Sequence, residues 1–249
     1  MDLGLKGKGA IVTGGGLGIG AGIAKVLARE GCNVAIVDLR EDDEVQDVLA
    51  EVEGQGVRGL AIQADVSVYA EAEEVVGRVV EEFGRLDIMV CNAGITRDGV
   101  IWKMTEKQWD QVMDVNLKGY FNYNQAAARH FKEMKYGKIV NISSINGMRG
   151  KFAQANYAAS KGGVIALSKS LAKELGRFNV NVNVVAPGMV LTEMMESLAA
   201  EFKAGAMAET VLGRFATPHD CANLVAFLCS DSSRHITGEV IKIDGGQYI

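Results

Sequence analysis

The sequence predicts an α/β fold in which one doubly wound parallel sheet of about seven strands carries helices on both faces. Short runs rich in Val and Ile alternate with longer stretches whose apolar residues recur at helical spacing. The short runs are almost continuously apolar, as strands must be when helices cover both faces of a parallel sheet. Strand and helix alternate along most of the chain, which is typical of parallel strands joined by helical crossovers.

Seven runs are expected to form the strands, because Gly, Asn or Asp residues that favour turns bound them. In chain order these runs are residues 9–13, 33–38, 59–66, 86–94, 137–144, 180–188 and 238–246. Between them, helices are predicted at 18–31, 68–84 and 159–178, and the first two stretches end at a glycine.

One helical stretch, at about 190–215, breaks this alternation between the sixth and seventh strands. A segment of that length outside the sheet predicts a lid over a binding site. Linkers, repeats and low-complexity segments are absent from the sequence, so residues 1–249 are expected to form a single domain.

The composition excludes several classes of partner. The net charge of −5, with no basic patch, argues against nucleic acid. Apolar runs fall short of the ~18 residues that span a membrane, and the N-terminus lacks the features of a signal peptide, which predicts a cytoplasmic protein. The four cysteines lie far apart without a C-x-x-C spacing, so neither a metal site nor a disulfide is expected.

A glycine-rich loop follows the first strand and opens the first helix. Its spacing is T-G-x-x-x-G-x-G, formed by Thr13, Gly14, Gly18 and Gly20. Bare backbone at a helix N-terminus lets a pyrophosphate approach the N–H groups, which the helix dipole makes attractive to anions. Asp38 ends the second strand, about 20 residues on, where a carboxylate can accept hydrogen bonds from an adenosine ribose. Together these features predict a nicotinamide dinucleotide, NAD(H).

A second group of residues predicts proton transfer. Tyr157 and Lys161 are four positions apart, so on a helix they share one face. A nearby ammonium favours the phenolate and lowers the pKa of a phenol from about 10. Ser144 closes the fifth predicted strand and is expected to place its hydroxyl in the crevice at the carboxyl ends of the strands.

These motifs together resemble the short-chain dehydrogenase/reductase family, and the resemblance extends over essentially the whole chain. It is carried by TGGGLGIG at 13–20, NAG at 92–94, Asn116, Ser144, YAASK at 157–161, APG at 186–188 and IDGG at 243–246. The resemblance implies a Rossmann-type sheet and an enzyme that interconverts a ketone and a secondary alcohol.

The resemblance also assigns roles to individual residues. Tyr157 would be the acid or base, Ser144 would hydrogen-bond the substrate oxygen, and Lys161 would bind the nicotinamide ribose and lower the Tyr157 pKa. Asn116 would shape the fourth helix and hold a water in a proton relay; these four are the expected catalytic residues. The expected cofactor-binding residues are Gly14, Gly16, Leu17, Gly18, Ile19, Gly20, Asp38, Leu39, Asp65, Val66, Asn92, Ala93, Gly94, Tyr157, Lys161, Pro187, Gly188, Val190 and Thr192. The expected substrate-binding residues are Ser144, Asn146, Gln154, Tyr157 and Met189.

Within the family, the chain looks most like β-ketoacyl-(acyl carrier protein) reductases and acetoacetyl-CoA reductases, which reduce 3-oxo thioesters. Those enzymes commonly use NADPH and carry a basic residue in the glycine loop or after the second strand. Here the loop has Leu17 and the strand ends in Asp38, which would repel a 2′-phosphate, although Arg40 is close by. NAD use leaves room for a catabolic dehydrogenase.

Several alternatives stay open at this point. The substrate could be a 3-oxoacyl or 3-hydroxyacyl thioester of acyl carrier protein or CoA, or a free secondary alcohol or sugar alcohol. A binding module without activity is a third possibility, which the intact catalytic residues disfavour. Arg129 and Lys173 lie where the resemblance places contacts to an acidic carrier, and Arg149 or Lys151 could receive an anionic group. A homotetramer is expected, paired through helices that contain 120–131 and 162–175 and through the last strand.

Overall fold

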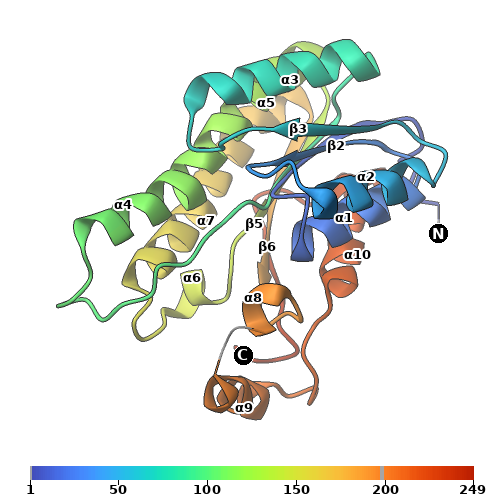
Figure 1. Cartoon of the computed structure of the whole chain (residues 1–249). Coiled ribbons are helices and arrows are strands. Elements are labelled where there is room, and N and C mark those ends of the chain that lie inside the picture. The colour runs from blue at the N-terminus through green and yellow to red at the C-terminus, as the bar shows by residue number, and fades with distance from the viewer. Residues whose placement is uncertain (1, 197–198) are drawn as a thin grey trace.

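The structure, a computed structural model, describes residues 2–196 and 199–249. Its centre is one seven-stranded parallel sheet with the strand order β3-β2-β1-β4-β5-β6-β7 (Figure 1). The strands are β1 Gly9–Thr13, β2 Asn33–Asp38, β3 Gly59–Gln63, β4 Ile88–Cys91, β5 Gly137–Ile142, β6 Val180–Pro187 and β7 Val240–Ile243. The predicted doubly wound α/β fold is therefore confirmed.

The order of the strands reverses beside β1. The chain builds β1, β2 and β3 outward in one direction and then returns, so β4 pairs with the other side of β1. Ala10 thus has Val34 of β2 on one side and Ile88 of β4 on the other. In open α/β sheets such a switch point leaves a crevice at the carboxyl ends of the two central strands.

Helices cover both faces of the sheet (Figure 1). One layer consists of α1 Gly18–Arg29, α2 Asp43–Glu53 and α10 Pro218–Cys229, and the other of α3 Tyr69–Phe83, α5 Gly119–Met134 and α7 Ala155–Leu175. Successive side chains of a strand point to opposite faces. Accordingly, Ala10 and Val12 of β1 belong to the core under α1 and α10, whereas Ile11 belongs to the core under α3, α5 and α7.

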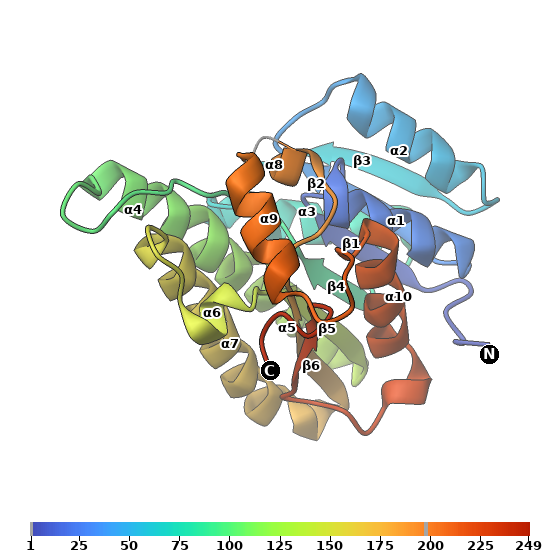
Figure 2. The same cartoon turned by 90° about the horizontal axis from the view of Figure 1, so that it is seen from below.

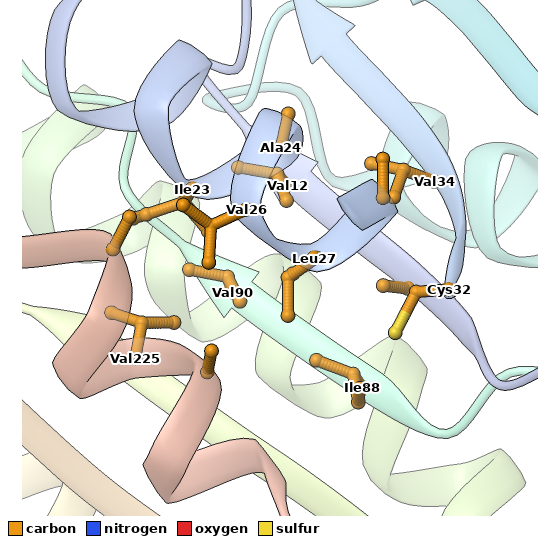
Figure 3. Packing of buried hydrophobic residues seen from close by; sticks show 14 of the residues in the cluster. Val12, Ile23, Ala24, Val26, Leu27, Cys32, Val34, Ile88, Val90 and Val225 are labelled. Carbon is orange, nitrogen blue, oxygen red and sulfur yellow. The ribbon is translucent and has the colours of Figure 1, made fainter. Parts of the chain in front are cut away.

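The core between α1, α10 and the sheet shows how this packing fixes the start of α1 (Figure 3). Ile23 and Leu27 of α1 are fully buried, as are Val90 of β4 and Val225 of α10. Burying such side chains contributes about 1.5–3 kcal/mol each to folding. The N-terminus of α1 is therefore held against β1 and β4, next to the switch point.

The remaining helices lie around the carboxyl ends of the strands. Helix α4 (Glu106–Met113) continues through a π-helical turn, Asp114–Lys118, into α5. Three short helices follow later in the chain: α6 Asn146–Arg149, α8 Glu193–Glu196 and α9 Ala200–Glu209. In Figures 1 and 2, α9 lies close to the C-terminus. Within the described residues, every helix is too short or too polar to cross a lipid bilayer.

The predicted lid segment, at about 190–215, is helical, although it forms two short helices rather than one; its residues 197 and 198 lie outside the described residues. Five predicted strands extend too far at their carboxyl ends: β3, β4, β5, β6 and β7 end at Gln63, Cys91, Ile142, Pro187 and Ile243. After β3 and β4 the extra residues leave the sheet and become loops of the cleft described below, because a ligand-binding edge needs backbone that is not paired in the sheet.

Candidate active site

A cleft of about 790 Å³ runs along the carboxyl ends of the strands at the switch point. Most of the residues predicted from the sequence line it. They are Gly14, Leu17, Gly18, Ile19, Asp38, Leu39, Asp65, Val66, Asn92, Ala93, Gly94, Ser144, Asn146, Gln154, Tyr157, Lys161, Pro187, Gly188, Met189, Val190 and Thr192. Three predicted residues, Gly16, Gly20 and Asn116, do not line the cleft and instead support the residues that do.

The glycine loop has the geometry expected of a pyrophosphate cradle. Gly14 and Gly18 have φ angles of 61° and 53°, in the left-handed region that favours glycine. A Cβ atom on Gly20 would lie 1.9 Å from the carbonyl oxygen of Gly14, so this helix position admits only glycine. The chain thus keeps bare backbone at the N-terminus of α1, where an anion is attracted by the N–H groups and the helix dipole.

Asn92 holds the two sides of the switch point together. Its Nδ2 donates hydrogen bonds to the carbonyl oxygens of Thr13 (3.1 Å) and Gly14 (3.0 Å). In return, the Thr13 hydroxyl accepts hydrogen bonds from the backbone N–H groups of Asn92 (3.0 Å) and Ala93 (3.3 Å). These four bonds fix the loop after β4 against the glycine loop, so the floor of the cleft is preorganised.

One end of the cleft is acidic. Asp38 accepts hydrogen bonds from the backbone N–H of Gly16 (3.1 Å) and of Arg40 (3.3 Å). The Arg40 guanidinium lies 3.6 Å from Asp38, 3.1 Å from Asp42 and 2.7 Å from Glu44. Three carboxylates therefore surround the Arg40 guanidinium, and the pKa of Arg40 is raised, chiefly by the hydrogen bond to Glu44.

The other end holds the predicted proton donor. Burial raises the pKa of Tyr157 to about 12, while a side-chain hydrogen bond with Ser144 partly opposes this shift. The hydroxyl of Ser144 also accepts a hydrogen bond from the backbone N–H of Asn146 (3.1 Å). Near neutral pH the phenol is therefore un-ionised and able to donate a proton to an oxygen held between Tyr157 and Ser144.

Lys161 lies on the same face of α7 as Tyr157, where it was expected to lower the pKa of the phenol. Its Nζ donates hydrogen bonds to the carbonyl oxygen of Ile142 (2.8 Å) and to the hydroxyl of Tyr120 (3.1 Å). It lies 5.9 Å from the centre of the Tyr157 ring. Burial lowers the pKa of Lys161 to about 7. Desolvation is the main cause of the pKa shifts of both Tyr157 and Lys161. The expected lowering of the Tyr157 pKa by Lys161 stays a prediction.

Asn116 lies in the π-helical turn and is fully buried. Its Oδ1 accepts a hydrogen bond from the backbone N–H of Ile95 (2.8 Å), and its Nδ2 donates to the carbonyl of Ile95 (2.9 Å) and to Ser160 Oγ (3.3 Å). A Cβ atom on Gly94 would lie 3.4 Å from both Asn116 Oδ1 and Lys161 Nζ. Asn116 therefore positions the loop after β4 beside Lys161; a water in a relay stays a prediction.

The substrate end contains residues that sequence reasoning did not connect. Gln154 donates to Asp98 (2.9 Å) and accepts from Asn146 (3.1 Å), and Gln247 accepts from the backbone N–H of Met189 (3.1 Å). Asp98 could have been suspected, because it closely follows the NAG motif. No sequence motif pointed to Gln247, since it comes to the cleft from the far end of the chain. Within the described residues, no group of three or more His, Cys, Asp or Glu side chains could hold a metal ion.

Comparison with known proteins agrees with this geometry. A family model described as enoyl-(acyl carrier protein) reductase matches residues 15–247. The chain belongs to the short-chain dehydrogenase/reductase family. It is 44% identical to the 3-oxoacyl-[acyl-carrier-protein] reductase FabG of Staphylococcus aureus (strain Mu50), over 97% of this chain and 98% of that protein. The proteins of the same name from Thermotoga maritima and Escherichia coli (strain K12) are 41% and 39% identical, each over 98% of this chain and over 99% and 98% of their own length.

The family is one of oxidoreductases that act on CH–OH groups and use a nicotinamide dinucleotide, which supplies or accepts a hydride. The residues fit such a cofactor, because the glycine loop bars any side chain at Gly20 and Asp38 faces the same cleft as Tyr157. The roles expected of Ser144 at the substrate oxygen and of Tyr157 in proton transfer stay predictions, and the shared cleft is compatible with them. Tyr120 and Ile142 hold Lys161 in the same cleft, 5.9 Å from the centre of the Tyr157 ring.

Replacing Tyr157 with Phe keeps the ring and removes the only titrating atom. We expect kcat on the best ketone substrate to fall by about 10²–10⁴-fold, which is the usual loss for a positioned acid or base. NADH binding, measured by fluorescence titration, should be retained. Near-full kcat in Tyr157→Phe would contradict the assignment.

The raised pKa of Tyr157 predicts different pH profiles in the two directions. Ketone reduction needs the phenol, which is un-ionised well below pH 12, so ionisation of Tyr157 should not lower its kcat from pH 6 to 9. Alcohol oxidation needs the phenolate, whose fraction rises about tenfold per pH unit below the pKa. The measurement is kcat at saturating cofactor and substrate in both directions. An oxidation rate that is already constant from pH 7 upward would show that Tyr157 ionises near neutrality.

Proposed function

We propose that the protein is an NAD(H)-dependent oxidoreductase that interconverts 3-oxoacyl and 3-hydroxyacyl thioesters. The observation that carries this proposal is the common cleft that contains Ser144 and Tyr157 at one end and Asp38 at the other. The three relatives named above are called 3-oxoacyl-[acyl-carrier-protein] reductases, which supports the choice of substrate. The un-ionised Tyr157 favours reduction near neutral pH.

The acidic end of the cleft supports NAD(H) rather than NADP(H). Asp38 is held in place by the backbone N–H of Gly16 and can accept hydrogen bonds from ribose hydroxyls. A 2′-phosphate, of about −1.5 to −2 charge, would meet this carboxylate. Arg40 is the nearby cation, and Asp42 and Glu44 already neutralise it. The sequence left the role of Arg40 open, and its ion pairs now favour NAD(H).

The proposal includes two carriers of the acyl group, CoA and acyl carrier protein. Arg129, which the resemblance placed at an acidic carrier, pairs with Glu73 on α3 and donates a hydrogen bond to Tyr69. This pairing reduces its attraction for a carrier, so CoA thioesters and acyl carrier protein thioesters are both substrates to test. A free secondary alcohol or sugar alcohol is the alternative. Rates with acetoacetyl-CoA, acetoacetyl-acyl carrier protein, simple ketones and polyols would separate these.

The cofactor preference predicts the effect of two substitutions. Asp38→Ser should weaken NAD(H) binding by about ten- to a hundredfold, since hydrogen bonds to a charged group contribute roughly 1.5–3 kcal/mol. NADP(H) should improve further in Asp38→Ser/Glu44→Gln, because Arg40 then loses two of its three carboxylate partners. The measurement is kcat/KM with each cofactor, and Asp43→Ser, outside this cluster, is the matched control. A wild-type preference for NADPH would contradict the proposal.

A homotetramer is also proposed, and a cytoplasmic location stays a prediction. Helix α5 exposes Phe121 and Met134, and the C-terminal Ile249 is almost fully exposed, as expected of surfaces that pair with other copies. Sedimentation velocity at micromolar concentration should give a particle of four times the chain mass of 26.6 kDa. A particle of 26.6 kDa would contradict the proposal.

A further inference from the structure

A continuous set of hydrogen bonds surrounds the substrate end of the cleft, with Arg149 at its centre. On one side Arg149 Nε lies 3.4 Å from Asn146 Oδ1, and Asn146 leads through Gln154 to Asp98. On the other side Arg149 Nη2 donates to Glu209 (3.0 Å) at the C-terminal end of α9, while Nη1 donates to the carbonyl oxygen of Gln247 (3.2 Å). Two amide side chains therefore separate the Arg149 cation from the Asp98 carboxylate.

Glu209 is an anion bound to Arg149, one of two cations that line this end of the cleft. Arg149 binds it directly, and the charge of Lys151 acts on it as well, so the pKa of Glu209 lies below its usual value, chiefly because of the Arg149 hydrogen bond. Arg149 and Lys151 both line the cleft. Lys151 forms no ion pair with any residue in the described part of the chain. Glu209 is itself half exposed and comes from the short helix α9, so an incoming anion can replace it.

We propose that Arg149 and Lys151 form a subsite for an anionic group carried by the substrate, which Glu209 fills when no such substrate is bound. The inference rests on the proposed function, since it names the class of thioester that the same cleft accepts. Guanidinium and ammonium groups suit a carboxylate or a phosphate, and the Arg fork can bind a carboxylate through two hydrogen bonds.

The position of Arg149 favours a carboxylate on the acyl chain over a phosphate of CoA. Only Asn146 separates Arg149 from the reacting oxygen: its side chain contacts Arg149, and its backbone N–H donates to Ser144. The phosphates of CoA lie beyond the long pantetheine arm, far from the carbonyl that is reduced. The subsite therefore fits the far end of a short 3-oxo-dicarboxylic acid bound as its mono-thioester.

The test compares three thioesters in the wild-type enzyme and in variants. 3-Oxohexanoyl-N-acetylcysteamine is neutral, 3-oxoadipyl-N-acetylcysteamine has the same chain length with a terminal carboxylate, and 3-oxohexanoyl-CoA carries only the phosphates. The readout is kcat/KM relative to the neutral thioester, which cancels effects on stability and on the chemical step. Glu209→Gln should raise this ratio for the carboxylate substrate by about two- to fivefold, because a partly exposed ion pair no longer competes.

Arg149→Gln should lower the same ratio by about tenfold or more, and Arg149→Lys should restore part of it. Glu201→Gln, an equal charge change on α9 at an exposed residue, is the matched control and should leave the ratio unchanged. A response confined to the CoA thioester would place the phosphate there and overturn the assignment to an acyl carboxylate. Ratios that do not change in any variant would overturn the subsite itself. No turnover of any of the three thioesters by the wild-type enzyme would instead refute the proposed function.

Discussion

The site depends on the hydrogen bonds that Asn92 makes across the switch point of the sheet. There β1 and β4 end side by side, and the Asn92 amide binds the carbonyl oxygens of Thr13 and Gly14. This contact leaves the glycine loop open toward the cleft and fixes it against the start of α1, where Gly20 meets Gly14 too closely for any side chain. The helix packing seen in Figure 3 also stabilises this part of the structure, because the buried side chains of Ile23 and Leu27 pack α1 against the sheet.

Desolvation explains the chemistry of the two central side chains better than their mutual charge does. Burial raises the pKa of Tyr157 to about 12 and lowers that of Lys161 to about 7, so both groups shift toward their neutral forms. A neutral phenol suits a proton donor to a ketone oxygen. At the opposite end of the cleft, Asp38, Asp42 and Glu44 pair with the Arg40 guanidinium. The cleft thus combines one end where burial shifts the pKa values of Tyr157 and Lys161 with another end that carries a cluster of charges.

Local patterns predicted much of this arrangement. The strand–helix alternation predicted the sheet, and the i,i+4 spacing placed Tyr157 and Lys161 on one face of α7. Helices α2 and α10 were not predicted, although Asp42 and Thr217 cap their N-termini through side-chain hydrogen bonds and Pro218 follows Thr217. The partners of Lys161 and Arg149 could not be predicted, because Tyr120, Glu209 and Gln247 are distant in sequence and only the fold brings them to the cleft.

Hydride transfer between NADH and the C3 carbonyl of a 3-oxoacyl thioester is the central claim, and isotope transfer tests it most directly. The enzyme would be incubated with NADH deuterated at the transferable position of C4 and with acetoacetyl-CoA, and the product would be examined by mass spectrometry. Our account predicts 3-hydroxybutyryl-CoA with one deuterium at C3 and one NAD⁺ formed per product molecule. NADH that is bound but not consumed, or a product without deuterium, would contradict it.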